Sequence, residues 1–150
     1  AFTLRRVGDP DGRHRILAGD TYYQLVEFGN PVRAKVLNAY GNASHVSARN
    51  IHEPGWVYVT YQGSFGHTLA RGYPAPYYGE VVAVRIDGPG TIRRIAHTHA
   101  VDHDYIAESH ASPSPDGSRV IFASNWDKAG RPVSSYVVAS SPGATIPNTD

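Results

Sequence analysis

"ESHASPSPDGSRVIFASNW", from Glu108 to Trp126, places a histidine before small residues, a Pro-Asp-Gly turn and an alternating apolar strand. The same order occurs earlier in "ASHVSARNIHEPGWVYVTY", from Ala43 to Tyr61. The sequence before each histidine also repeats, with two apolar runs joined by a Gly-Asn-Pro or a Gly-Pro-Gly turn. Two similar stretches at a fixed distance along the chain are the signature of a repeat architecture. We therefore expect a β-rich unit that occurs more than once.

The composition is that of a globular chain. It has 150 residues, 41% hydrophobic and 18% charged, enough for one domain with a core. A net charge of +1 argues against a nucleic-acid partner. Twelve arginines against two lysines suit an acidic ligand, although ordinary surface charge explains the bias as well. The lack of cysteine excludes disulfides, thiolate catalysis and cysteine-bound zinc. No apolar stretch is long enough to cross a bilayer, so no membrane span is expected.

Short alternating apolar runs, separated by glycine and proline, predict strands throughout, and no helical period persists. The expected strands are Tyr22–Phe28, Val32–Leu37, Trp56–Tyr61, Glu80–Asp87, Thr91–Ala96, Arg119–Ser124 and Ser134–Ala139. Each copy of the repeat is also expected to begin with a short strand, in "SHVSAR" and in "SHASPS". A repeat that holds four short strands is typical of a propeller blade.

The predicted fold is all-β, a partial β-propeller of four-stranded antiparallel blades in a single section, 1–150. It divides into an incomplete blade (1–42), a full blade (43–97) and a second incomplete blade (98–150). Closed propellers need about four to eight blades, so missing sequence, another chain or self-association would complete the ring. An irregular β-sandwich is the structural alternative.

The second copy of the repeat resembles the blade signature of TolB-like propellers. The tetrapeptide Ser114-Pro115-Asp116-Gly117 matches that signature as written, followed by an apolar strand and a Ser-Asn end. The first copy departs from it with His52-Glu53-Pro54-Gly55. The resemblance implies a propeller and a secreted or periplasmic location. The chain begins at Ala1 and lacks methionine, which favours a processed chain or a piece of a longer one.

Two long connections should emerge at one end of the blades, because successive strands run in alternate directions. These connections are Gln62–Gly79 and His97–Glu108, and long connections in compact domains are often functional. The expected ligand-binding residues of the first are His67, Tyr73, Tyr77 and Tyr78. Six histidines should share this end: His45, His67, His97, His99, His103 and His110.

The stretch "HTHAVDH" suggests a metal site formed by His97, His99 and His103. Histidines two apart on an extended strand point the same way, and neutral imidazoles bind divalent metals. Zinc, manganese or calcium is the candidate ion. The alternative is a solvated loop that is rich in histidine.

A further resemblance is to oligogalacturonate lyase and the ulvan lyases, which are propellers with ligands on one face. It implies β-elimination, in which Arg71 neutralises a uronate carboxylate, His110 or His45 removes the C5 proton, and Tyr105 or Tyr78 protonates the leaving oxygen. The sequence "AESHAS" departs from the Gln-x-x-His-x-His run of the metal-dependent enzymes. Alternatively, both histidines have a structural role in joining neighbouring blades.

The sequence thus predicts a secreted or periplasmic β-propeller module with a face rich in histidine and tyrosine, which binds a carbohydrate or protein ligand. The alternative function is a polysaccharide lyase that acts on uronate-containing polymers. Tyrosine, at ten residues against four phenylalanines, fits a wet binding surface better than a dry core.

Overall fold

The structure is a computed structural model, and its described elements are all β-strands. It describes the backbone of 6–8, 14–19, 22–27, 30–38 and 145–146, and both backbone and side chains of 43–62, 76–86, 91–101, 107–128 and 132–140. The strands are β1 (Arg6–Gly8), β2 (His14–Gly19), β3 (Tyr22–Glu27), β4 (Asn30–Asn38), β5 (Ala43–Ser47), β6 (Trp56–Tyr61), β7 (Glu80–Arg85), β8 (Ile92–His97), β9 (Ser112–Pro113), β10 (Arg119–Ser124), β11 (Ser134–Ala139) and β12 (Thr145–Ile146). The all-β prediction is therefore confirmed. No helix in this described part is long and apolar enough to cross a membrane.

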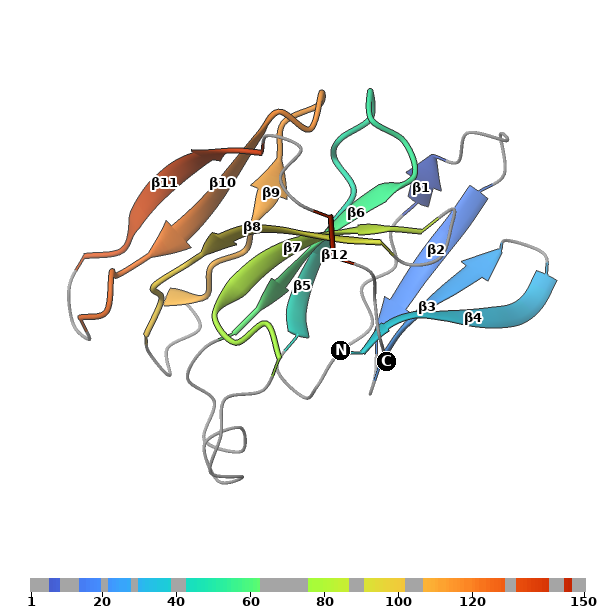
Figure 1. The fold of residues 1–150 in the computed structure, drawn as a ribbon, viewed down its shortest axis with the longest axis horizontal. Helices are drawn as coiled ribbons and strands as arrows, with labels where there is room; N and C mark the ends of the chain where they lie inside the picture. The colour runs from blue at the N-terminus through green and yellow to red at the C-terminus, as the bar shows by residue number, and fades with distance from the viewer. Residues whose placement is uncertain are drawn as a thin grey trace.

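The strands form three antiparallel sheets, in which strands that follow one another in sequence lie side by side (Figure 1). Their orders are β1-β2-β3-β4, β12-β8-β7-β6-β5 and β11-β10-β9. The sheet of β5–β8 is central, with β1–β4 on one side and β9–β11 on the other (Figure 1). Residues 1–42, expected to be an incomplete unit, contain four strands because β1 and β2 precede the two predicted ones.

The central sheet is buried on both of its faces. Every residue of β6 is buried, although its side chains point alternately to opposite sides. On one face, Val57 and Val59 pack with Val82 and Val84 of β7 in a continuous apolar cluster. A strand that is buried on both faces requires a layer on each side. The stacked arrangement of the sheets therefore follows from the burial of β6.

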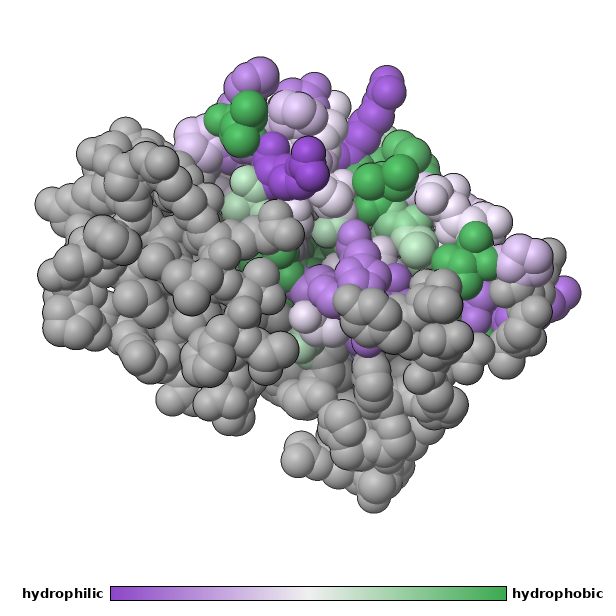
Figure 2. Space-filling model, turned by 180° about the vertical axis from the view of Figure 1, so that it is seen from behind, coloured by the Kyte–Doolittle hydropathy of each residue, from purple (hydrophilic) through white to green (hydrophobic). Residues whose placement is uncertain are grey.

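The opposite face of the central sheet packs against the third sheet. Trp56, Tyr58 and Val81 form one apolar cluster with Val120 and Phe122 of β10. The outer face of the third sheet is more exposed, and Ile121 and Val137 lie opposite each other there. Figure 2 shows the apolar side chains on the rear of the molecule as separate spots among hydrophilic ones.

Strand pairing brings four strand ends together, as the alternating strand directions predicted. The start of β5 pairs with the end of β6 (Ala43 with Tyr61), and the start of β7 pairs with the end of β8 (Glu80 with His97). The segments that follow β6 and β8 therefore leave the central sheet at the same end, which we call the histidine end.

One pairing was not predicted. The two-residue strand β12 adds to the outer edge of β8, with Thr145 opposite Arg93 and Ile146 opposite Ile92. It therefore extends the central sheet rather than supplying a fourth strand beside β11.

Candidate functional site

His45 and His110 meet at the histidine end, between the central and third sheets. His45 lies in β5, and His110 lies two residues before β9. Their ring centroids are 3.7 Å apart, with the ring planes inclined by 32°. Two residues further along each copy, the hydroxyls of Ser47 and Ser112 are 3.4 Å apart. Equivalent positions of the two repeats are therefore in direct contact.

Glu108 provides a carboxylate between the two histidines. Its Oε2 is 2.6 Å from Nε2 of His45 and 3.5 Å from Nε2 of His110. The Glu108 side chain is only 17% exposed, so its charge is poorly solvated and favours a nearby cation or hydrogen-bond donor. The three side chains form a compact polar cluster, which we call the His-Glu-His cluster.

Backbone contacts on both sides hold His110 in an unusual conformation. Its φ is +41°, which is uncommon for a residue other than glycine. The amide of Ala111 donates to Oγ1 of Thr60 in the central sheet at 3.1 Å. On the other side, the carbonyl of Ser109 accepts from the amide of Ala123 at 2.9 Å. A strained residue persists where its surroundings fix it, and such residues concentrate at functional sites.

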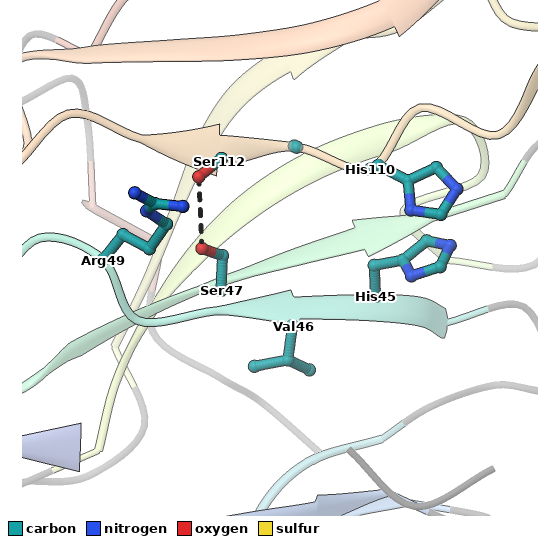
Figure 3. A pocket seen from close by; sticks show the side chains of 7 residues that line it. His45, Val46, Ser47, Arg49, His110 and Ser112 are labelled. Atoms are coloured by element: carbon teal, nitrogen blue, oxygen red, sulfur yellow. Dashed lines mark hydrogen bonds between the residues drawn. The ribbon is translucent and has the colours of Figure 1, made fainter. Parts of the chain in front are cut away.

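A pocket of about 240 Å³ opens beside the cluster (Figure 3). It is lined by His45, Val46, Ser47, Arg49, His110, Ala111 and Ser112. This volume is below the roughly 300–1,000 Å³ of sites for drug-sized ligands, so the pocket suits one small group or ring. Arg49 is exposed, and its guanidinium has no partner among the residues described here. One wall of the pocket therefore carries a positive charge that no described residue neutralises.

The His-Glu-His cluster has the donor set of a divalent metal site. One donor atom from each of its three residues lies within 4.8 Å of the others. Two imidazoles and one carboxylate are a common ligand set for zinc, and imidazole also suits other transition metals, whereas calcium prefers oxygen ligands throughout. Three protein ligands leave coordination positions open to a bound molecule. The residues present therefore fit zinc or manganese better than calcium.

The predicted metal ligands His97 and His99 are arranged differently. Their ring centroids are 4.6 Å apart, but Nδ1 of His97 accepts a hydrogen bond from the His99 amide at 3.2 Å. Nδ1 of His99 is 2.7 Å from Oδ2 of Asp127. Each ring thus has one nitrogen engaged by the protein. The third predicted ligand, His103, lies outside the described residues.

Of the predicted tyrosine and loop residues, two are described. Tyr77 is partly buried, with its ring 5.2 Å from that of Tyr61 and the guanidinium of Arg94 above it at 5.4 Å. Tyr78 is partly buried at the histidine end. The predicted residues that lie outside the described part are His67, Arg71, Tyr73 and Tyr105.

Sequence reasoning did not identify Glu108 and Arg49 as site residues. Glu108 stands two positions before His110, and Arg49 stands four positions after His45. The only signal in the sequence for these two residues is that a charged residue stands near each repeated histidine. Charged residues at such positions are common on ordinary protein surfaces. The contact between the two repeats is what gives these residues a shared pocket.

No family model, curated protein or solved structure matches the chain. The site is therefore interpreted from its own geometry.

Proposed function

We propose that the chain is a section of a β-propeller that binds an acidic carbohydrate at its histidine end. The observation that carries this proposal is the convergence of His45, Glu108 and His110, from the starts of two adjacent sheets, around a pocket that also contains Arg49. The stacking of β-meander sheets supports the propeller. The exposed Ile121 and Val137 support a further sheet, from another chain, a second copy or more of the same protein, on the outer face of β10 and β11.

Each part of the pocket has a role in this proposal. Arg49 pairs with the carboxylate of a uronate ring, because guanidinium binds carboxylates through parallel hydrogen bonds. The imidazoles of His45 and His110 exchange hydrogen bonds with ring hydroxyls. When a divalent metal is held by the His-Glu-His cluster, it supplies additional positive charge toward the same carboxylate. The small volume of the pocket limits this site to one sugar unit of a longer chain.

Calorimetric titration with short oligogalacturonates tests the proposal, with neutral galacto-oligosaccharides as the charge control. We expect binding of the acidic series alone, and a loss of about tenfold in affinity for Arg49→Gln, as when a charge-assisted pair is removed. His110→Ala should lower affinity as well. The matched control is His52→Gln, because His52 is exposed in the turn between β5 and β6 at the opposite end. Equal binding of both series, or wild-type affinity in Arg49→Gln and His110→Ala, contradicts the proposal.

A second candidate function, uronate β-elimination, is favoured by the 2.6 Å contact between His45 and Glu108. A carboxylate at one ring nitrogen can orient an imidazole toward a substrate, so His45 is the candidate base. The base removes the C5 proton, the C5 electron pair forms a C4–C5 double bond, and the O4 leaving group departs with a proton from His110. Arg49 neutralises the uronate carboxylate, the role that the sequence had given to Arg71.

The ultraviolet absorbance of the unsaturated product distinguishes this reaction from binding alone. We expect His45→Gln to abolish product formation while it leaves much of the oligogalacturonate binding. If uronate polymers yield no product with the wild-type protein, either with zinc or manganese or after chelation, the protein is not a lyase for them and the binding function stands.

A further inference from the structure

A second cluster of rings lies at the histidine end, near β8 rather than near β5, where His45 lies. It begins with His97, the last residue of β8, whereas His45 lies in β5. The strands β6 and β7 separate these two strands. Strands in a sheet are about 4.8 Å apart, so β5 and β8 are roughly 14 Å apart, a distance that several linked sugar units can span.

Two chain segments are clamped together to build this second cluster. The amide of Asp127 donates to the carbonyl of His99 at 2.7 Å, and the amide of Val101 donates to the Asn125 side chain at 2.9 Å. The Asn125 side chain donates in return to the carbonyl of Val101. His99, Trp126 and Asp127 all have positive φ values, between 51° and 58°. The clamp thus holds three residues in a strained conformation that presents their side chains at the surface.

The hydrogen bonds in the cluster define what each imidazole offers to a ligand. Nδ1 of His97 accepts from the His99 amide, so the proton of neutral His97 is on Nε2. Nδ1 of His99 donates to the carboxylate of Asp127, which leaves a lone pair on Nε2 of neutral His99. Within the described part of the chain, neither Nε2 atom has a hydrogen-bond partner. One ring therefore offers a donor and the neighbouring ring an acceptor.

An exposed indole completes the cluster. Trp126 is 43% exposed, and its ring stacks on His99 with the centroids 4.6 Å apart. The ring of Tyr136 supports it at 4.9 Å. An exposed tryptophan held in a fixed orientation beside polar groups is typical of recognition surfaces, since its rigid apolar surface costs little conformational entropy on binding.

We propose that His97, His99 and Trp126 form a second subsite for a pyranose ring. One ring hydroxyl donates to Nε2 of His99, a neighbouring hydroxyl accepts from Nε2–H of His97, and the sugar lies against the exposed edge of the indole of Trp126, whose faces are packed on His99 and Tyr136. The carboxylate of Asp127 disfavours a second carboxylate here, so this subsite binds the hydroxyl edge of the sugar. The inference rests on the proposed carbohydrate-binding function and extends it to a polymer that bridges two subsites.

Tryptophan fluorescence with acrylamide as quencher tests the subsite directly. The chain has two tryptophans, and Trp56 is only 4% exposed, so quenching reports on Trp126. The probes are oligogalacturonates of two and six units. We expect the six-unit probe to protect Trp126 from acrylamide, and the two-unit probe to protect it much less. No protection by the six-unit probe, when calorimetry shows that it binds, overturns the inference.

The discriminating variant is His99→Asn. The asparagine amide can replace Nδ1 as the donor to Asp127 but lacks an acceptor at the position of Nε2, and asparagine tolerates positive φ better than most residues. We expect about a tenfold loss of affinity for the six-unit probe, no change for the two-unit probe, and an unchanged midpoint of urea unfolding. Wild-type affinity of both His99→Asn and Trp126→Phe for the six-unit probe overturns the inference. If the wild-type protein binds neither probe, the proposed function itself fails.

Discussion

Replacing Gly117 by alanine should destabilise the contact between the third sheet and the central sheet. Gly117 ends the Ser-Pro-Asp-Gly turn before β10, and its φ is +70°. A Cβ atom there would lie 2.1 Å from Oε2 of Glu53, in the turn between β5 and β6. Glu53 must then move, although its other carboxylate oxygen pairs with Arg93 at 3.1 Å and the hydroxyl of Tyr58 contacts Oε2 at 3.4 Å. The substitution therefore disturbs a side chain that is held by β6 and β8 of the central sheet and lies against the turn before β10.

The expected magnitude has two parts. A left-handed conformation costs alanine about 1–2 kcal/mol. Loss of the Glu53–Arg93 pair costs about 1.5–3 kcal/mol, because both side chains are largely shielded, at 29% and 16% exposed. The total is about 2.5–5 kcal/mol, which is a large fraction of the roughly 5–15 kcal/mol that stabilises a typical domain.

Urea unfolding measures this cost, and a double-mutant cycle with Glu53→Ala separates its two parts. Trp56 reports on the region, because the Arg93 guanidinium lies 3.6 Å from the centroid of its ring. In the Glu53→Ala background, Gly117→Ala should cost only the conformational part, about 1–2 kcal/mol. Additive effects of the two substitutions, or a cost below about 1 kcal/mol for Gly117→Ala alone, would refute the reasoning.

Two ionisable groups give pH-dependent predictions. Hydrogen bonds from the Ser114 hydroxyl, and then from the amide and hydroxyl of Ser118, lower the pKa of Asp116 from 3.8 to about 2. Because its pKa is lowered, ionised Asp116 stabilises the folded state above pH 4, and this contribution is lost as pH falls toward 2. When the urea midpoint is measured between pH 4 and pH 2, it should therefore fall less for Asp116→Asn than for the wild-type protein. Burial raises the pKa of Tyr58 above 10, so folded stability should fall as pH rises from 10 through this higher pKa. Tyr58→Phe should remove one tyrosine that ionises above pH 10 from an alkaline absorbance titration and cost about 1 kcal/mol, since Tyr58 donates to the Gly117 carbonyl at 3.3 Å; an unchanged titration would contradict this.

Strong local patterns made most strands predictable. The bounds of β6, β10 and β11 coincide with the predicted runs, because β-branched and aromatic residues there are bounded by turn residues on both sides. The two-residue strands β9 and β12 are too short to show any period. Their pairing depends on where the neighbouring sheets lie, which is tertiary information. The full burial of β6 was hidden for the same reason, since Tyr58 and Thr60 resemble a polar face of the strand.

The candidate site was predictable only in part. The repeated histidines were visible, and alternating strand directions placed both at one end. The 2.6 Å contact of His45 with Glu108, however, joins positions 63 apart in sequence. The position of Arg49 on the same pocket likewise depends on the stacking of two sheets. Local spacing carries no information on such contacts, so the sequence could indicate the residue types but not the partners.

The two copies of the repeat differ at the position that gives the site its carboxylate. In "ASHVS" and "ESHAS", the serine and histidine positions match, and the matched residues touch across the two sheets. The residue two positions before the histidine is Ala43 in the first copy and Glu108 in the second. One carboxylate therefore lies beside two imidazoles, whereas a glutamate in both copies would add a second negative charge nearby. A single copy contains only one histidine of the cluster, so the candidate site is a property of the paired sheets rather than of either repeat.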